Sequence, residues 1–162
     1  MIPDLLTCDN LVNQTLAMLT ETLVLTNPQQ CHHVVLTGGN VGMSITRELS
    51  QVAESVPERV WADTHFWWGD ERFVASDHPD RNDRDIKSAL ADYFIESNVH
   101  RVTPSDQIAD AQGSADRYLQ ELLNFGENGS APQFCFVILG VGPDGHIASL
   151  FPGRPELNSH AI

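Results

Sequence analysis

The segment from Val137 to Gly153, which reads VILGVGPDGHIASLFPG, constrains the fold more than any other part of the chain. It continues a β-branched and aromatic run that begins at Phe134, and such a run is typical of a central strand covered on both faces of a sheet. Three glycines, at positions 140, 142 and 145, then interrupt the run. Glycines let the main chain adopt positive φ and come close to a ligand, and in open α/β sheets ligands bind beyond the strand ends. The segment therefore predicts a buried strand followed by a functional turn.

The same turn carries two side chains with acid and base chemistry, Asp144 and His146. Imidazole can remove and return a proton near neutral pH, so His146 is the best candidate for a general base. We expect the other histidines to be structural or on the surface, since none has comparable loop context. They are His32, His33, His65, His78, His100 and His160.

Two other kinds of catalysis find no support in the sequence. The histidines show no HExxH or similar spacing, so we expect no metal ion. The glycines at 140–145 fit GxGxxG only without the strand and helix context that a dinucleotide fold requires, so we expect no cofactor either. A serine nucleophile would need a GxSxG elbow, and the chain has none. Water is therefore the expected nucleophile of any hydrolysis.

Composition narrows the possible partners. The chain has 162 residues, 41% of them hydrophobic, which is enough for one substantial core. Its net charge of -13 argues against nucleic acid and against an anionic membrane surface, because both need clustered Lys and Arg. A small anionic substrate stays possible, because four basic residues concentrate in one stretch: Arg72, Arg81, Arg84 and Lys87. The sequence does not predict an oligomeric state.

The cysteines and the first residues bear on location. Cys8, Cys31 and Cys135 are odd in number and lack metal-ligand spacing, so we expect all three to stay reduced. The opening MIPDLLTCDN has no basic leader pattern, and no window approaches the roughly 18 apolar residues of a membrane span. These features predict a cytoplasmic protein.

Strand and helix patterns alternate along the chain. Periodicity predicts helices over 10–26, 41–53, 85–93 and 106–125, and strands over 33–37, 64–68 and 134–139. The alternation predicts a mainly parallel, Rossmann-like sheet with helices on both faces, built from βαβ units. Trp67 and Trp68 are expected to pack on opposite faces of that sheet.

Each predicted strand ends in an unusual loop: TGGN at 37–40, GDER at 69–72 and GVGPDGH at 140–146. In a parallel sheet these loops share one edge. The first offers backbone N–H groups at a helix N-terminus, which favours phosphate, and Arg72 offers a planar fork of donors for an anion. Each loop alone leaves a structural explanation open, because a GG pair is often a tight turn and a DER triplet is often solvated.

Together, the three motifs resemble the 6-phosphogluconolactonase family, within the wider superfamily of sugar-phosphate isomerases and deaminases. The matching stretches are LTGGNVGMSITREL (36–49), WWGDERFVASDHPDRND (67–83) and VILGVGPDGHIASLFPG (137–153). The resemblance implies hydrolysis of 6-phospho-D-glucono-1,5-lactone in the pentose phosphate pathway. It also implies that residues 1–162 form a single α/β domain that is the N-terminal portion of a longer lactonase domain.

The resemblance further implies roles for individual residues. His146 would act as general base on water, and either Asp70 or Asp144 would set the tautomer of its imidazole. The residues implied in binding substrate and phosphate are Gly38, Gly39, Asn40, Arg72, Gly142 and Gly145. The implied partner is a small phosphosugar lactone.

Two alternatives remain. Glucosamine-6-phosphate deaminases share a DGH turn but continue it as IAFNEP and carry MDEY, whereas this chain reads IASLFP and GDER. These differences favour hydrolysis over deamination. The second alternative is a phosphosugar-binding module without catalytic activity.

Overall fold

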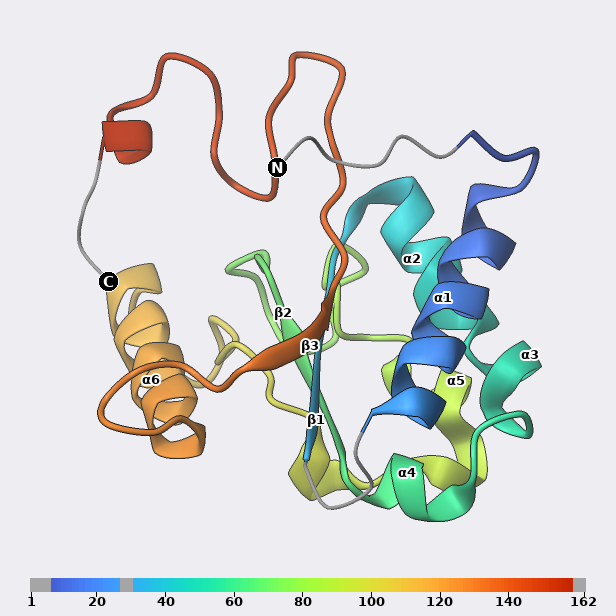
Figure 1. Ribbon diagram of the computed structural model, residues 1–162. Coiled ribbons are helices and arrows are strands. Elements are labelled where there is room, and N and C mark those ends of the chain that lie inside the picture. Colours follow the sequence, from blue (N-terminus) through green and yellow to red (C-terminus); the bar gives the residue numbers. More distant parts are fainter. Residues whose placement is uncertain (1–6, 27–30, 159–162) are drawn as a thin grey trace.

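Three parallel strands form the centre of the fold (Figure 1). The computed structural model describes residues 7–26 and 31–158. In that part of the chain the strands are β1 (His32–Leu36), β2 (Thr64–Trp68) and β3 (Phe134–Val137). Their order is β2-β1-β3, and β1 pairs in parallel with both neighbours. The predicted α/β class with a parallel sheet is confirmed.

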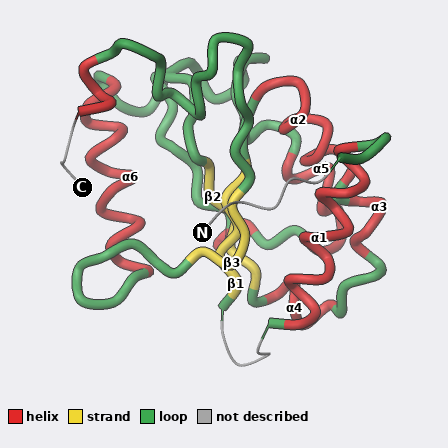
Figure 2. Tube along the Cα trace, turned by 45° about the horizontal axis from the view of Figure 1, so that its top comes forward, coloured by secondary structure: helices red, strands yellow, loops and turns green. Residues whose placement is uncertain are grey.

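Helices cover both faces of this sheet. Among the helices of the described residues, five lie on one face and α6 (Ala111–Phe125) lies on the other, an arrangement that can be followed in Figures 1 and 2. The five are α1 (Leu11–Leu25), α2 (Gly39–Glu48), α3 (Ser50–Ala53), α4 (Glu58–Ala62) and α5 (Ile86–Leu90). Short 3₁₀ turns occur at η1 (Ala91–Tyr93), η2 (Glu96–Asn98) and η3 (Pro155–Asn158).

The two faces of the sheet differ in chemistry because alternate strand residues point to opposite sides. Phe66 and Trp68 face the apolar core, together with buried leucines of α1. His33, His65, Trp67 and Phe125 of α6 form an aromatic cluster on the other face, in which the rings of His33 and His65 stack and Phe125 meets Trp67 edge-on. The predicted placement of the two tryptophans on opposite faces is confirmed.

The prediction that the third strand is central and covered on both faces is wrong for the described part of the chain. There β3 pairs only with β1 and lies at the sheet edge. Val137 is 47% exposed, whereas every residue of β1 is buried. An apolar run can occupy an edge position as well as a central one, and only pairing distinguishes the two.

Helix boundaries also differ from the predictions. The helix predicted over 41–53 divides into α2 and α3, because the Leu49 N–H bonds to the Thr46 carbonyl three residues back and tightens the turn. The helix predicted from 106 begins at Ala111, where the Asp110 carboxylate accepts from the Gly113 N–H at 2.8 Å. The short helix α4 was not predicted.

The structure bears on the four remaining predictions to different extents. Cys8, Cys31 and Cys135 are free thiols. His160 lies outside the described residues, and the extent of a single domain over 1–162 stays a prediction. Within residues 7–26 and 31–158, no helix has both the length and the apolar character needed to cross a membrane.

Candidate active site

A pocket of about 670 Å³ lies at the edge of the sheet where the three strands end. The loops after β1, β2 and β3 all contribute to its wall, as their common position in a parallel sheet predicts. The predicted site residues that line it are Gly38, Gly39, Asn40, Asp70, Arg72, Gly142 and His146. Asp144 and Gly145 do not line it.

The first wall of the pocket is the N-terminus of α2. Gly39 has φ +73, a conformation that L side chains rarely adopt. No side chain caps this helix end, so its first N–H groups and the positive end of the helix dipole are available to an anion. Gly38 is required for a different reason, because a Cβ there would lie 2.1 Å from Oδ1 of Asn82.

Asn82 is a pocket residue that the sequence analysis missed. Its buried side chain packs under Gly38 and donates from Nδ2 to the Asp70 carbonyl at 3.0 Å. Its backbone N–H donates to Oε1 of Glu71 at 2.8 Å. Asn82 therefore joins the loop after β2 to the loop after β1. In the sequence it is one of many polar residues in a long loop, and no local signal distinguishes it.

A buried charge cluster supports the loop after β2. Arg81, whose side chain is 1% exposed, donates to both carboxylate oxygens of Asp83 and lies 3.5 Å from Oε2 of Glu71. Burial raises the pKa of Glu71, although backbone N–H groups of Asn82 and Arg72 and the charge of Arg81 oppose the shift. The cluster fixes the loop from beneath.

This arrangement corrects the expectation that several basic residues are available to an anionic substrate. Arg81 forms an ion pair with the buried carboxylate of Asp83. Arg84 donates to the Pro79 carbonyl and pairs with Asp85, and the ammonium of Lys87 lies over the ring of Phe94. Of the four basic residues in that stretch, Arg72 alone lines the pocket. Its side chain is exposed and has no ion-pair partner among the described residues.

His146 forms the third wall and has a carboxylate partner in its own turn. Nδ1 of the ring lies 2.5 Å from Oδ1 of Asp144, and this hydrogen bond lowers the pKa of Asp144. The ring packs against Gly142, where a Cβ would lie 2.0 Å from Cε1. Gly145 has φ +84 and closes the turn by donating to the Gly142 carbonyl at 2.9 Å. Of the three glycines expected to allow positive φ in this turn, only Gly145 uses it.

Asp70 takes a different partner. Its Oδ2 accepts a hydrogen bond from Oγ of Ser149 at 2.9 Å, and no hydrogen bond joins it to the His146 ring. Of the two aspartates left open by the sequence, Asp144 is therefore the one at the imidazole. Within residues 7–26 and 31–158, no group of three or more His, Cys, Asp or Glu side chains is arranged to hold a metal ion.

Comparison with known proteins agrees with this architecture. Residues 7–161 match the family described as glucosamine-6-phosphate isomerases/6-phosphogluconolactonase. The chain is 38% identical over 128 residues to a 6-phosphogluconolactonase of Synechocystis and 40% identical over 129 residues to one of Mycobacterium tuberculosis. These alignments cover 76% of this chain and 50% and 51% of the relatives. The chain thus spans about half the length of these relatives.

Solved structures give the same result. A 6-phosphogluconolactonase from Thermotoga maritima superposes with a TM-score of 0.70 at 28% identity, covering 88% of this chain and 61% of that one. The fold, the three loops at one sheet edge and the family match over residues 7–161 lead to one assignment. The chain belongs to the glucosamine-6-phosphate isomerase and 6-phosphogluconolactonase family.

Proposed function

We propose that this chain provides the catalytic pocket of a 6-phosphogluconolactonase, which hydrolyses 6-phospho-D-glucono-1,5-lactone to 6-phospho-D-gluconate. One observation carries the proposal: a helix N-terminus, an arginine without an ion-pair partner among the described residues, and a histidine backed by a carboxylate line one pocket. The relatives named 6-phosphogluconolactonase support the choice of substrate. The free cysteines support placing the reaction in the cytoplasm.

In this proposal the phosphate binds at the start of α2. The uncapped N–H groups after Gly38 offer donors, and the helix dipole favours negative charge there. Arg72 reaches the same pocket and offers paired N–H donors to a phosphate oxygen or to the charge that develops on the sugar. Neither contact requires a metal ion.

His146 acts as the base. When Nδ1–H donates to Asp144, the lone pair of the neutral ring lies on Nε2, which then accepts a proton. Nε2 takes one proton from a water molecule as the water oxygen bonds to C1 of the lactone. The carbonyl electrons move onto oxygen, giving a tetrahedral oxyanion and an imidazolium paired with Asp144.

Collapse of this intermediate completes the reaction. The carbonyl re-forms, the bond from C1 to the ring oxygen breaks, and the imidazolium returns its proton to that oxygen. The product is the open-chain acid, which ionises at neutral pH. A positioned base contributes about 10²–10⁴ in rate, and a lactone is already a reactive ester, so no covalent enzyme intermediate is needed.

A three-part assay tests the proposal. It measures lactone disappearance above the spontaneous rate, ammonia release from glucosamine 6-phosphate, and the unfolding temperature with 6-phosphogluconate. The proposal predicts catalysed lactone loss and no ammonia. Ammonia release would instead indicate a deaminase, and stabilisation by 6-phosphogluconate without turnover would indicate a binding module.

A further inference from the structure

The segment that carries His146 has few attachments to the rest of the molecule. Residues 139–158 form the orange-to-red loop that stands above the sheet in Figure 1. The Ile138 N–H makes the last main-chain hydrogen bond to the sheet, to the Val35 carbonyl at 2.9 Å. Beyond it, within the described residues, one hydrogen bond joins the segment to the body: Ser149 Oγ donates to Asp70 Oδ2 at 2.9 Å.

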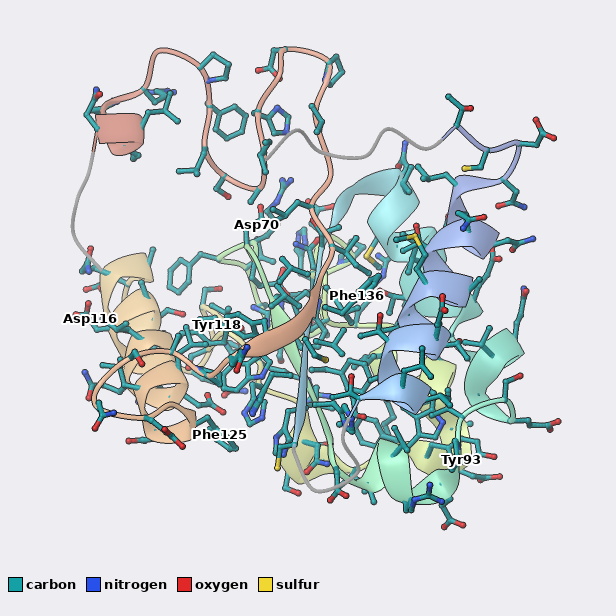
Figure 3. The ribbon with its side chains drawn as sticks, in the orientation of Figure 1. Asp70, Tyr93, Asp116, Tyr118, Phe125 and Phe136 are labelled. Carbon is teal, nitrogen blue, oxygen red and sulfur yellow. The ribbon has the colours of Figure 1, made fainter. Side chains whose placement is uncertain are left out.

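That bond joins two loops of the pocket across 79 positions of sequence. Asp70 follows β2 and lies near the base of the projecting segment (Figure 3). Ser149 follows His146 by three positions. Asp70 and His146 both line the pocket, so the bond connects the part of the wall that is fixed to β2 with the part that carries the imidazole.

The local backbone presents Ser149 to Asp70. The Leu150 N–H donates to the Ile147 carbonyl at 2.9 Å, which closes a tight turn around Ala148 and Ser149. Ala148 has φ +51, an uncommon conformation for a residue other than glycine, asparagine or aspartate. The turn that contains Ala148 in this conformation also places Oγ of Ser149 within hydrogen-bond distance of Asp70, in the loop after β2.

Asp144 cannot perform this task. It holds the ring of His146 at 2.5 Å, but both residues belong to the same short turn. The contact therefore fixes the ring relative to its own loop and leaves the loop unfixed relative to the pocket. Only an attachment to another element can fix the loop, and Ser149 to Asp70 is such an attachment.

We propose that Ser149 and Asp70 form a clasp that positions His146 over the pocket, with Asp70 acting through Ser149 and not on the substrate. The kinetic part of this inference rests on the proposed lactonase function. A base displaced by about 1 Å can cost up to ~10²-fold in rate, so the clasp should affect kcat more than binding.

The substitution Ser149→Ala removes the donor and leaves the backbone turn. We expect kcat for lactone hydrolysis to fall about 10- to 100-fold and KM to change by less than about twofold, because α2 and Arg72 are untouched. Ser149→Thr keeps a hydroxyl and should recover most of the lost kcat.

Ser76→Ala is the matched control. Its Oγ donates to Asp106 Oδ2 at 2.7 Å, so it removes another exposed serine–aspartate bond, at a position that does not line the pocket. It should leave kcat and KM at wild-type values. Equal losses in the Ser149 and Ser76 variants would overturn the clasp.

A double-mutant cycle separates the clasp from a direct role of Asp70. If Asp70 acts through Ser149, Asp70→Ala lowers kcat in the wild-type background but lowers it no further in the Ser149→Ala background. A further loss in that background would mean that Asp70 touches the substrate or water itself, and the inference would be wrong.

Hydrogen–deuterium exchange tests the clasp without any activity. Backbone amides of residues 140–150 should exchange faster in Ser149→Ala than in the wild-type chain, and Ser76→Ala should leave them unchanged. If the wild-type chain does not hydrolyse the lactone, the proposed function fails and the exchange result alone decides the clasp. Unchanged exchange in Ser149→Ala would overturn it.

Discussion

His146 and His100 each have a carboxylate at Nδ1, yet the two pairs are placed very differently. His146 lies 2.5 Å from Asp144 and His100 lies 2.6 Å from Glu121. The His146 side chain is 29% exposed at a pocket, whereas that of His100 is 2% exposed beneath α6.

The second nitrogen of each ring makes the difference. Nε2 of His100 bonds to Nδ1 of His65 at 2.8 Å, and its ring stacks on Trp67 with centroids 3.8 Å apart. His146 lines the pocket, and its Nε2 has no hydrogen-bond partner among the described residues. Under the proposed function, the same pair of groups would serve a reaction in one place and packing in the other, and access to Nε2 would distinguish the two.

The largest expected effect comes from removing each imidazole in turn. His146→Ala should lower kcat by about 10²–10⁴ and leave the unfolding temperature near the wild-type value, because the ring lies on an exposed loop. His100→Ala should instead lower the unfolding temperature and leave kcat near the wild-type value. It leaves a cavity and unpaired groups on His65 and Glu121, at a cost of about 2–4 kcal/mol.

Lactone hydrolysis and thermal unfolding of both variants provide the measurement. For a chain of this size, each kcal/mol corresponds to a drop of about 2–4 °C. If His146→Ala destabilised the fold as much as His100→Ala while keeping its kcat, the distinction between the two pairs would be lost.

A methyl group beside His146 should have the next largest effect. In Gly142→Ala the new Cβ would meet the ring at 2.0 Å, so the ring must move, and kcat should fall by about 10²-fold. Gly140→Ala is the matched control in the same loop, because its Cβ would meet nothing within 4 Å. Steady-state kinetics of the two variants gives the ratio of their kcat values, and a ratio near one would show that the position of the His146 ring is unimportant.

Removing the carboxylate charges should have a smaller effect. Asp144→Asn weakens the acceptor for Nδ1–H and should lower kcat by about tenfold, less than the loss for a buried carboxylate of this kind, because Asp144 is exposed. Glu121→Gln is the counterpart in the buried pair. It should reduce stability and leave kcat unchanged, and urea unfolding together with steady-state kinetics would separate the two outcomes.

The smallest effect concerns pH. Burial lowers the pKa of His33 to about 4 and also lowers the pKa values of His65 and His100. The unfolded chain, with ordinary values near 6.5, binds more protons than the folded one between about pH 6.5 and 4. The contribution of these histidines to the free energy of unfolding is therefore full above this window and is lost as the pH falls through it.

Thermal unfolding between pH 7.5 and pH 4.5 measures this loss. His65→Gln should flatten the dependence of stability on pH, because it removes one of the histidines whose pKa burial lowers in the folded chain. A wild-type stability independent of pH across this range would be incompatible with a neutral buried cluster.

Much of the fold could be predicted from local patterns. Apolar runs located β1 and β2 within one residue, and parallel connections implied that the loops after all three strands meet. The position of β3 at the sheet edge could not be predicted, because an apolar run does not reveal how many neighbours it pairs with.

The candidate site was also predictable where it depends on local sequence patterns, and not where it depends on contacts between loops. Glycine-rich turns and a histidine with a nearby aspartate are local signals, and they identified the three loops that contribute to the pocket wall. Asn82 and the partner of Asp70 were not predictable, because each depends on which loop packs against which. Ser149 lies 79 positions from Asp70, and no spacing in the sequence links them.

Chemical modification tests the central comparison most directly. Diethyl pyrocarbonate acylates accessible imidazole nitrogens, and mass spectrometry can identify each modified histidine while lactone hydrolysis is followed in the same samples. We predict that loss of activity parallels modification of His146, that 6-phosphogluconate slows both, and that His33, His65 and His100 stay unmodified in the folded chain. Loss of activity with His146 unmodified, or early modification of the buried cluster, would contradict the account.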